Sequence, residues 1–157
     1  MSGFQFGSHI VIPPNQVFFE TELSFAFVNL RPVVPGHILI ASRRNAKRFT
    51  DLTREEAADL AAVAHVLIDP LEKYYGCTAT TLTVQDGAAA GQTVDSVHFH
   101  LIPRRAGDFP DSDHFQQLIE EKRADRSVDE MALEAGKLRE LFANQQTKFL
   151  NKPFESQ

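Results

Sequence analysis

Short β-rich runs separated by tight turns fill the start of the chain, and their spacing limits the possible folds more than any other feature. The runs cover residues 9–12, 17–20, 24–29 and 37–41. Prolines and glycine mark the turns between them, as in Pro35-Gly36. Parallel neighbours would need crossover connections of about a dozen residues or more, and these gaps are shorter. The sequence therefore predicts an antiparallel sheet.

The spacing of apolar residues changes to that of a helix after residue 53. Thr53 and Glu56 form a capping box, in which each side chain satisfies a free backbone N–H. Apolar residues then recur on one helix face, at positions 57, 60, 64, 67, 68, 71 and 74. Gly76 is a stop signal. Pro70 lies inside this pattern and predicts a kink or a division of the helix.

The second half of the chain adds two strands and another helix. The strands are predicted at 80–85 and 97–102. A second capping box, Ser127–Glu130, opens a helix whose apolar face carries Met131, Ala135, Leu138 and Phe142. This order of strands and helices predicts an α+β fold, with an antiparallel sheet of about five strands and two main helices.

We expect a single domain spanning residues 1–157, because no repeat or linker divides the chain. Residues 106–126 are polar and turn-rich, which predicts a mobile loop. Residues 147–157 are expected to form a loosely ordered tail.

Composition argues against several classes of partner. The formal net charge of −5 gives no long-range attraction to a polyanion, so we expect no nucleic-acid partner. No apolar run approaches the roughly 20 residues that span a bilayer, so we expect no membrane partner. The single cysteine, Cys77, excludes an intramolecular disulfide. With no signal-peptide pattern at the start of the sequence, we expect a cytoplasmic protein.

The strand predicted at 97–102 presents two different faces. Because side chains alternate across a strand, one face carries Ser96, His98 and His100. The opposite face is apolar, with Val97, Phe99 and Leu101. Successive residues on one face stand about 6.5–7 Å apart, so two imidazoles would lie side by side.

Three interpretations of this histidine pair remain open from the residues alone. The strand can simply be half-buried, with two histidines on its polar face. It can hold zinc, which needs a third or fourth ligand. Only His37 is an obvious further ligand, because Cys77 precedes a different strand. It can also catalyse a displacement, with one imidazole as nucleophile and the other moving a proton, because a pKa near 6.5 makes both forms accessible.

Neighbouring segments favour a phosphorylated ligand. The glycine-bearing loop before the histidine strand includes Gln85, Gln92 and Thr93, which can present neutral donors to phosphate oxygens. Arg43, Arg44, Lys47 and Arg48 form a stripe of basic residues. We interpret this stripe either as a guide for a polyphosphate or as a charged edge exposed to solvent.

Three runs around the histidines carry a family resemblance: Gln85-Asp86-Gly87, Gly91-Gln92-Thr93-Val94 and His98-Phe99-His100-Leu101-Ile102-Pro103-Arg104. They resemble the histidine-triad (HIT) hydrolases, and most of all the fragile-histidine-triad branch of dinucleoside polyphosphate hydrolases. The resemblance extends in order and at matching spacing over residues 4–109.

The resemblance implies an α+β domain that dimerises so that two sheets become one. It implies substrates such as diadenosine triphosphate, cleaved to AMP and the remaining nucleotide. His98 matches the nucleophile, which a backbone carbonyl orients, and His100 matches the group that assists the leaving oxygen. His37 matches a supporting histidine, and Ser96 replaces the first histidine of the family motif. Gln85 is expected to stabilise charge on the non-bridging oxygens.

The same resemblance assigns two sets of binding residues. Ribose and phosphate contacts fall on Asn29, Gln85, Gln92 and Thr93. The base pocket falls on Phe6, His9, Val11, Phe27 and Leu39, for which plain core packing is the alternative. No tightly bound cofactor or metal is expected, and Mg²⁺ is expected to arrive with the substrate. A nucleoside phosphoramidase and a slow-turnover nucleotide-binding signalling protein are the alternative functions.

Overall fold

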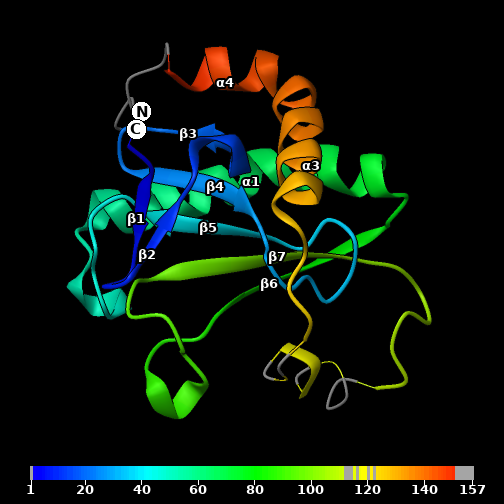
Figure 1. Ribbon diagram of the computed structural model, residues 1–157, viewed down its shortest axis with the longest axis horizontal. Coiled ribbons are helices and arrows are strands. Elements are labelled where there is room, and N and C mark those ends of the chain that lie inside the picture. Colours follow the sequence, from blue (N-terminus) through cyan, green and yellow to red (C-terminus); the bar gives the residue numbers. More distant parts are fainter. Residues whose placement is uncertain (1, 112–114, 116, 120, 122, 151–157) are drawn as a thin grey trace.

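The computed structural model describes residues 2–111, 115, 117–119, 121 and 123–150. Seven strands are present in these residues: β1 (Phe4–Phe6), β2 (Ile10–Ile12), β3 (Val17–Glu20), β4 (Ser24–Val28), β5 (Ile38–Ser42), β6 (Ala79–Val84) and β7 (His98–Arg104). β1 and β2 form a hairpin, and the other five form one antiparallel sheet in the order β3-β4-β5-β7-β6. The α+β prediction and the five-stranded sheet are therefore confirmed (Figure 1).

The predicted strands match the observed ones to within two residues at each end. The strand at 17–20 is reproduced, and the strand predicted at 97–102 runs from His98 to Arg104. β1 was not predicted, because its three residues carry too little periodicity to distinguish a strand from a loop. β1 matters because it pairs with β2 and brings Phe6 onto the sheet.

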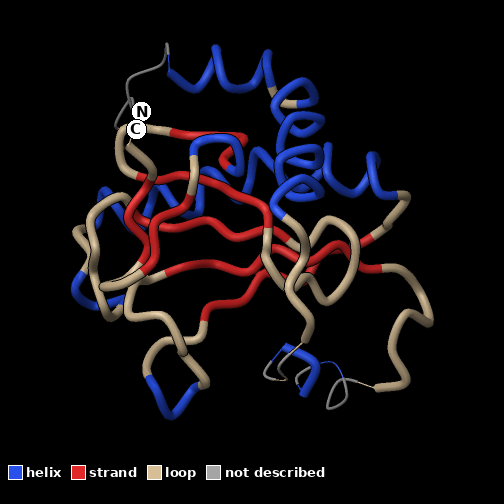
Figure 2. The backbone as a smooth tube through the Cα atoms, viewed as in Figure 1, coloured by secondary structure: helices blue, strands red, loops and turns tan. Residues whose placement is uncertain are grey.

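Two helices pack close to the sheet: α1 (Arg54–Tyr75) and α3 (Val128–Leu141), and α4 (Ala143–Leu150) follows α3. Both capping boxes are confirmed, because Thr53 Oγ1 accepts from Glu56 N and Ser127 Oγ accepts from Glu130 N, each at 3.1 Å. Three short 3₁₀ turns lie at Pro14–Gln16, Phe49–Asp51 and Ala88–Ala90. Figure 2 shows these helical segments around the strands.

The structure corrects two details expected for α1. Of the kink or division predicted at Pro70, the division is excluded, because the helix is continuous from Arg54 to Tyr75. Proline costs one backbone hydrogen bond, and the fully buried Leu67 and Leu71 anchor the turns on either side of it. Tyr74, expected on the buried face, is 45% exposed, and Val63 is buried instead.

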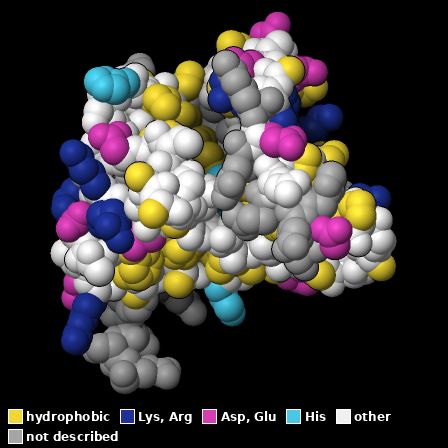
Figure 3. Space-filling model, turned by 90° about the horizontal axis from the view of Figure 1, so that it is seen from below, with side chains coloured by type: hydrophobic (Ala, Val, Ile, Leu, Met, Phe, Trp, Pro, Cys, Tyr) yellow, Lys and Arg dark blue, Asp and Glu magenta, His cyan; other side chains and the backbone are white. Residues whose placement is uncertain are grey.

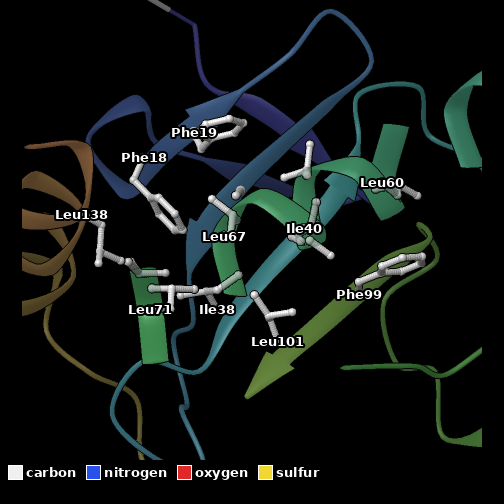
Figure 4. Close-up of a cluster of buried hydrophobic side chains, with 14 of the residues drawn as sticks. Phe18, Phe19, Ile38, Ile40, Leu60, Leu67, Leu71, Phe99, Leu101 and Leu138 are labelled. Carbon is white, nitrogen blue, oxygen red and sulfur yellow. The ribbon is translucent and has the colours of Figure 1, made fainter. Parts of the chain in front are cut away.

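Each face of the sheet has its own apolar cluster. The larger cluster lies between the sheet, α1 and α3, and Figure 4 shows Ile38, Ile40, Leu67 and Leu101 in it. The expected helix face of Met131, Ala135, Leu138 and Phe142 belongs to this cluster. The smaller cluster lies on the other face, where the β1–β2 hairpin contributes Phe6 and Ile12. His98 and His100 of β7 lie on this second face.

The segment 106–126 is only partly described. Phe115 is buried, and its ring lies 5.2 Å from that of Phe109 and 4.3 Å from the Arg104 guanidinium. Residues 117–119 are helical. The rest of the predicted mobile loop at 112–114, 116, 120 and 122, like the tail at 151–157, lies outside the described residues. Residues 147–150 of the expected tail belong to α4.

None of the helices among the described residues has the length and apolar character needed to cross a bilayer.

Candidate active site

A cavity of about 750 Å³ opens on the sheet face opposite α1. Its walls come from the β1–β2 hairpin, from β4, β5 and β7, and from Ile119, Glu121 and Arg123. Nine of the residues proposed from sequence line it: Phe6, Val11, Phe27, Asn29, Leu39, Gln85, Thr93, His98 and His100. A volume of this size is typical of a small-ligand site.

His98 presents an unprotonated ring nitrogen to the cavity. Its Nδ1 lies 2.7 Å from the carbonyl oxygen of Ser96. A carbonyl only accepts hydrogen bonds, so Nδ1 carries the proton and Nε2 keeps its lone pair. The side chain is 7% exposed, and burial lowers the pKa of His98, which favours the neutral ring. This is the arrangement of a nucleophilic imidazole, with the orienting backbone carbonyl that the sequence analysis expected.

His100 presents the opposite group, an N–H donor. The backbone N–H of Val33 donates to His37 Nδ1 at 3.0 Å, so the proton of neutral His37 is on Nε2. His37 Nε2 lies 2.9 Å from His100 Nδ1 and 3.1 Å from Asn29 Nδ2. The Asn29 NH2 group cannot accept a hydrogen bond, so His37 Nε2 donates its proton to His100. The remaining proton of His100 is then on Nε2, which is buried and has no hydrogen-bond partner among the described residues. This N–H is available to a ligand in the cavity.

The pKa shifts of this pair support the neutral forms. Burial is the main cause that lowers the pKa of His100 to about 3, followed by the charges of His98 and Arg123. Burial also holds the pKa of His37 well below its usual range, followed by the charge of His100. The three rings are close, with centroids 5.1 Å apart for His98 and His100 and 5.2 Å for His37 and His100.

The chain path before His37 requires a glycine. Gly36 has a φ of 87°, a region that L side chains rarely adopt. A Cβ at Gly36 would also approach the Tyr75 ring to 2.6 Å. This turn places His37 at the start of β5, behind His100, where it is 1% exposed and does not line the cavity.

Ser96 takes part in the site only through its main chain. Its side chain is fully buried, and Oγ has no hydrogen-bond partner among the described residues. The residue that replaces the first motif histidine therefore contributes its carbonyl to His98 and no side-chain hydrogen bond.

The polar residues expected to bind ribose and phosphate fall into two groups. Gln85 and Thr93 line the cavity, and Gln85 Nε2 is buried without a partner in the described part of the chain. Asn29 also lines it, and its Oδ1 accepts from Arg31 N at 2.9 Å. Gln92 is not among the lining residues. Its amide instead holds the loop together, accepting from Gly87 N at 2.7 Å and donating to two carbonyls.

Four of the five residues expected to form a base pocket line the cavity. Phe6, Phe27 and Leu39 belong to the smaller apolar cluster and also line the cavity, while Val11 lines it half-exposed. The Phe6 ring meets the His98 ring edge-on at 5.0 Å. His9 lies exposed in the turn between β1 and β2 and is not among the lining residues.

Three of the four basic side chains in the stripe between 43 and 48 are paired with acidic side chains. Arg43, Arg44 and Arg48 form ion pairs with Glu20, Glu56 and Asp86 respectively. On the face seen in Figure 3, basic side chains are interspersed with acidic ones. The three arginines of the stripe are therefore already engaged by carboxylates.

Three arginines that were not predicted as site residues adjoin the cavity. Arg31 and Arg123 line it, and Arg126 donates to the carbonyl of Asn29 and pairs with Glu134 at 3.0 Å. No motif or periodicity distinguishes these arginines, because they lie in irregular segments brought to the cavity by tertiary packing.

The donor set of the histidines bears on the zinc interpretation. Among the described residues, no group of three or more His, Cys, Asp or Glu is arranged to hold a metal ion. The hydrogen bonds also leave one imidazole lone pair in the cavity, on His98. A second ligand from His100 would require the tautomers of both His37 and His100 to change.

Comparisons with known proteins agree with these features. The HIT domain family model matches residues 12–107. The chain is 43% identical over 154 residues to the bifunctional bis(5'-adenosyl)-triphosphatase/adenylylsulfatase FHIT of Arabidopsis thaliana, covering 90% of this chain and 85% of the relative. It is 44% identical over 138 residues to the bis(5'-adenosyl)-triphosphatase of Dictyostelium discoideum, covering 88% and 93%.

A solved structure with a similar fold agrees with these matches. The Plasmodium falciparum diadenosine triphosphate hydrolase in complex with cyclomarin A matches with a TM-score of 0.77 and 32% identity. That match covers 93% of this chain and 86% of the other.

Proposed function

This chain belongs to the HIT-domain family, and we propose that it hydrolyses dinucleoside polyphosphates such as diadenosine triphosphate to AMP and the remaining nucleotide. The observation that carries the proposal is the pairing of opposite groups in one cavity. His98 Nε2 offers a lone pair, while His100 Nε2 offers an N–H. The two relatives named as bis(5'-adenosyl)-triphosphatases, matched over most of their length, support the substrate class.

In the first step, His98 Nε2 attacks the α-phosphorus of the substrate. The N–P bond forms as the bond from phosphorus to the bridging oxygen breaks, and the leaving nucleotide departs on the opposite side. His100 Nε2–H donates to that oxygen as its negative charge develops. The carbonyl of Ser96 holds the Nδ1 proton and stabilises the positive charge that the ring acquires.

In the second step, water attacks the nucleotidyl-histidine. The P–N bond breaks, His98 recovers its lone pair, the water releases a proton to the solvent, and AMP is released. Each step inverts the configuration at phosphorus, so the two together retain it. Gln85 Nε2 is placed to donate to a non-bridging oxygen in both steps.

The scheme requires no resident metal or cofactor, and Mg²⁺ is expected to accompany the polyphosphate. Prolonged chelation followed by assay with added Mg²⁺ should leave full activity. Stoichiometric zinc in the purified protein, lost together with activity on chelation, would support a metal mechanism instead.

The edge of the sheet supports a homodimer. β6 pairs with β7 on one side and is the last described strand of the sheet. Leu82 and Val84 on it are 46% and 37% exposed. An exposed apolar edge strand is a template for pairing with a second copy, which would continue the sheet. Sedimentation at twice the chain mass of 17.6 kDa is expected, and Leu82→Lys should yield the monomer.

We expect the protein to act in the cytoplasm, where Cys77 stays reduced.

Rapid quenching with labelled diadenosine triphosphate tests the proposed chemistry. An acid-labile nucleotidyl adduct should form on His98 and be absent from His98→Ala. An adduct that persists in the alanine variant would overturn the mechanism. Faster turnover of adenosine 5'-phosphoramidate would indicate a phosphoramidase, and tight binding without turnover would indicate a signalling protein.

A further inference from the structure

Arg123 forms part of the cavity wall, in the described part of the segment 106–126. Its Nε and Nη2 donate to the carbonyl of Arg31, at 3.1 and 2.7 Å, and Nη1 donates to the carbonyl of Glu121 at 3.3 Å. These bonds fix the plane of the guanidinium. A guanidinium has five N–H groups, so two remain without an acceptor among the described residues.

Among the described residues, Arg123 also has no ion-pair partner, unlike its arginine neighbours. Arg31 forms an ion pair with Asp125, and Arg126 forms one with Glu134. No carboxylate in the described part of the chain lies within ion-pair distance of Arg123. Glu121, whose side chain is exposed, is the nearby acidic residue that raises the pKa of Arg123, against the larger lowering effect of desolvation.

The position of Arg123 relative to the histidines indicates which part of a substrate it would meet. Its Nε and Nη2 are hydrogen-bonded to the carbonyl of Arg31, whose N–H donates to Asn29 Oδ1 at 2.9 Å. Asn29 Nδ2 lies 3.1 Å from His37 Nε2, which lies 2.9 Å from His100 Nδ1. This chain of contacts places Arg123 on the His37–His100 side of the cavity, and its charge accordingly lowers the pKa of both histidines. Because an in-line displacement places nucleophile and leaving group on opposite sides of phosphorus, this is the leaving-group side.

We propose that Arg123 binds the phosphate groups of the departing nucleotide, through the two free N–H groups of a guanidinium held in place by main-chain carbonyls. It thereby selects substrates whose leaving group is itself a phosphate. The inference rests on the proposed function, because it takes His98 as the nucleophile. A fixed guanidinium is well suited to the task, since its fork matches two phosphate oxygens.

Two substrates that share the adenylyl group test the role of Arg123. Diadenosine triphosphate releases ADP, whereas the 4-nitrophenyl ester of AMP releases a phenol without phosphate. Arg123→Ala should lower kcat/KM for diadenosine triphosphate about 10- to 100-fold, the cost of losing a charge-assisted hydrogen bond. It should leave kcat/KM for the ester within about twofold. Arg123→Lys should recover part of the loss, because it restores the charge without the fork.

Arg105→Ala is the matched control. Arg105 is exposed and also donates to a main-chain carbonyl, that of Tyr75 at 3.2 Å, away from the cavity. This variant should behave as wild type with both substrates. An equal loss of activity on both substrates in Arg123→Ala would overturn the inference, because it would mean that Arg123 only braces the segment around Arg31. No loss on either substrate would overturn it as well.

Product binding separates this inference from the proposed function. With its adenosine in the apolar pocket, ADP places its β-phosphate where the leaving group sits. Arg123→Ala should therefore weaken ADP binding about tenfold in calorimetry and leave AMP binding unchanged. If the wild-type protein failed to hydrolyse diadenosine triphosphate, the proposed function would fall, and the ADP-to-AMP ratio would still decide the role of Arg123.

Discussion

The α1 face and the cavity face of the sheet both bury polar side chains, but they satisfy them differently. On the α1 face, Ser42 donates to Glu56, Arg44 pairs with Glu56, and Thr21 donates to Asp59. Ser24 Oγ is an exception on that face. On the cavity face, three buried atoms have no partner among the described residues: Gln85 Nε2, Ser96 Oγ and His100 Nε2.

This difference separates stability from binding. A buried donor without a partner costs about 1–3 kcal/mol, which a ligand returns when it accepts that hydrogen bond. The α1 face, with its polar groups paired and its large apolar cluster, stabilises the fold. The cavity face keeps polar atoms unpaired, and two of them, Gln85 Nε2 and His100 Nε2, belong to residues that line the cavity.

The largest expected effect is a loss of catalytic activity at the cavity face without a loss of stability. His98→Asn should lower kcat about a thousandfold or more, roughly 4 kcal/mol in barrier, because no other group can form the covalent bond. Its thermal stability should stay close to that of wild type. Saturating kinetics with diadenosine triphosphate, together with calorimetric unfolding, measure both quantities. Residual activity within tenfold of wild type would contradict the role of His98.

A substitution on the opposite face of β7 should lower stability and leave catalytic activity nearly unchanged. Leu101 is fully buried on the α1 face, three residues from His98. Leu101→Ala should lower the free energy of unfolding by about 2–5 kcal/mol through lost burial and a cavity. The kcat of the folded fraction should change little. Urea unfolding and active-site titration check the two parts, and a wild-type unfolding midpoint would contradict this account of the α1 face.

Titratable groups on the two faces should affect the free energy of unfolding in different pH ranges. The pKa of His100 is lowered from 6.5 to about 3, so the unfolded chain binds its proton first and stability falls as pH drops below 6.5. The hydrogen bond from Arg44 is the main cause that lowers the pKa of Glu56 from 4.5 to about 2, so its contribution persists above pH 4.5 and is lost towards pH 2.

Each of these groups contributes a slope of about 1.4 kcal/mol per pH unit within its window. His100→Asn should reduce the slope between pH 6.5 and 4.5, where His37 and His98 also contribute, and Glu56→Gln should reduce it below pH 4.5. Chemical denaturation at half-unit pH steps measures both. If Glu56→Gln flattened the upper window instead, the assignment of the two faces would be reversed.

The smallest effects are expected at Ser96. Because Oγ has no partner in the described structure, Ser96→Ala should leave kcat within about twofold and keep or slightly raise the unfolding midpoint. Ser96→His should change kcat by no more than about tenfold, or roughly 1.4 kcal/mol. A thousandfold increase with Ser96→His would mean that the natural protein is a nucleotide binder with little activity.

The sequence predicted those parts of the molecule that local chemistry controls. Alternation in β7 placed His98 and His100 on one face, and the Thr53 capping box fixed the start of α1. Long-range packing decided the rest. The sequence contains no signal that Gln92 uses its amide within its own loop, or that Arg123 comes from an irregular segment to the cavity wall. Pro70 stays helical for the same reason, because buried neighbours outweigh its local preference.

The amide of Val33 has a consequence for how this site can change over generations. It decides which nitrogen of His37, and through it which nitrogen of His100, carries hydrogen. Every amino acid except proline supplies the same N–H, so substitution of the Val33 side chain leaves that group in place. A codon change to proline would remove it. The path of the backbone thus determines which nitrogen of His37 and of His100 carries the proton. A comparison of side chains between relatives would not reveal this property.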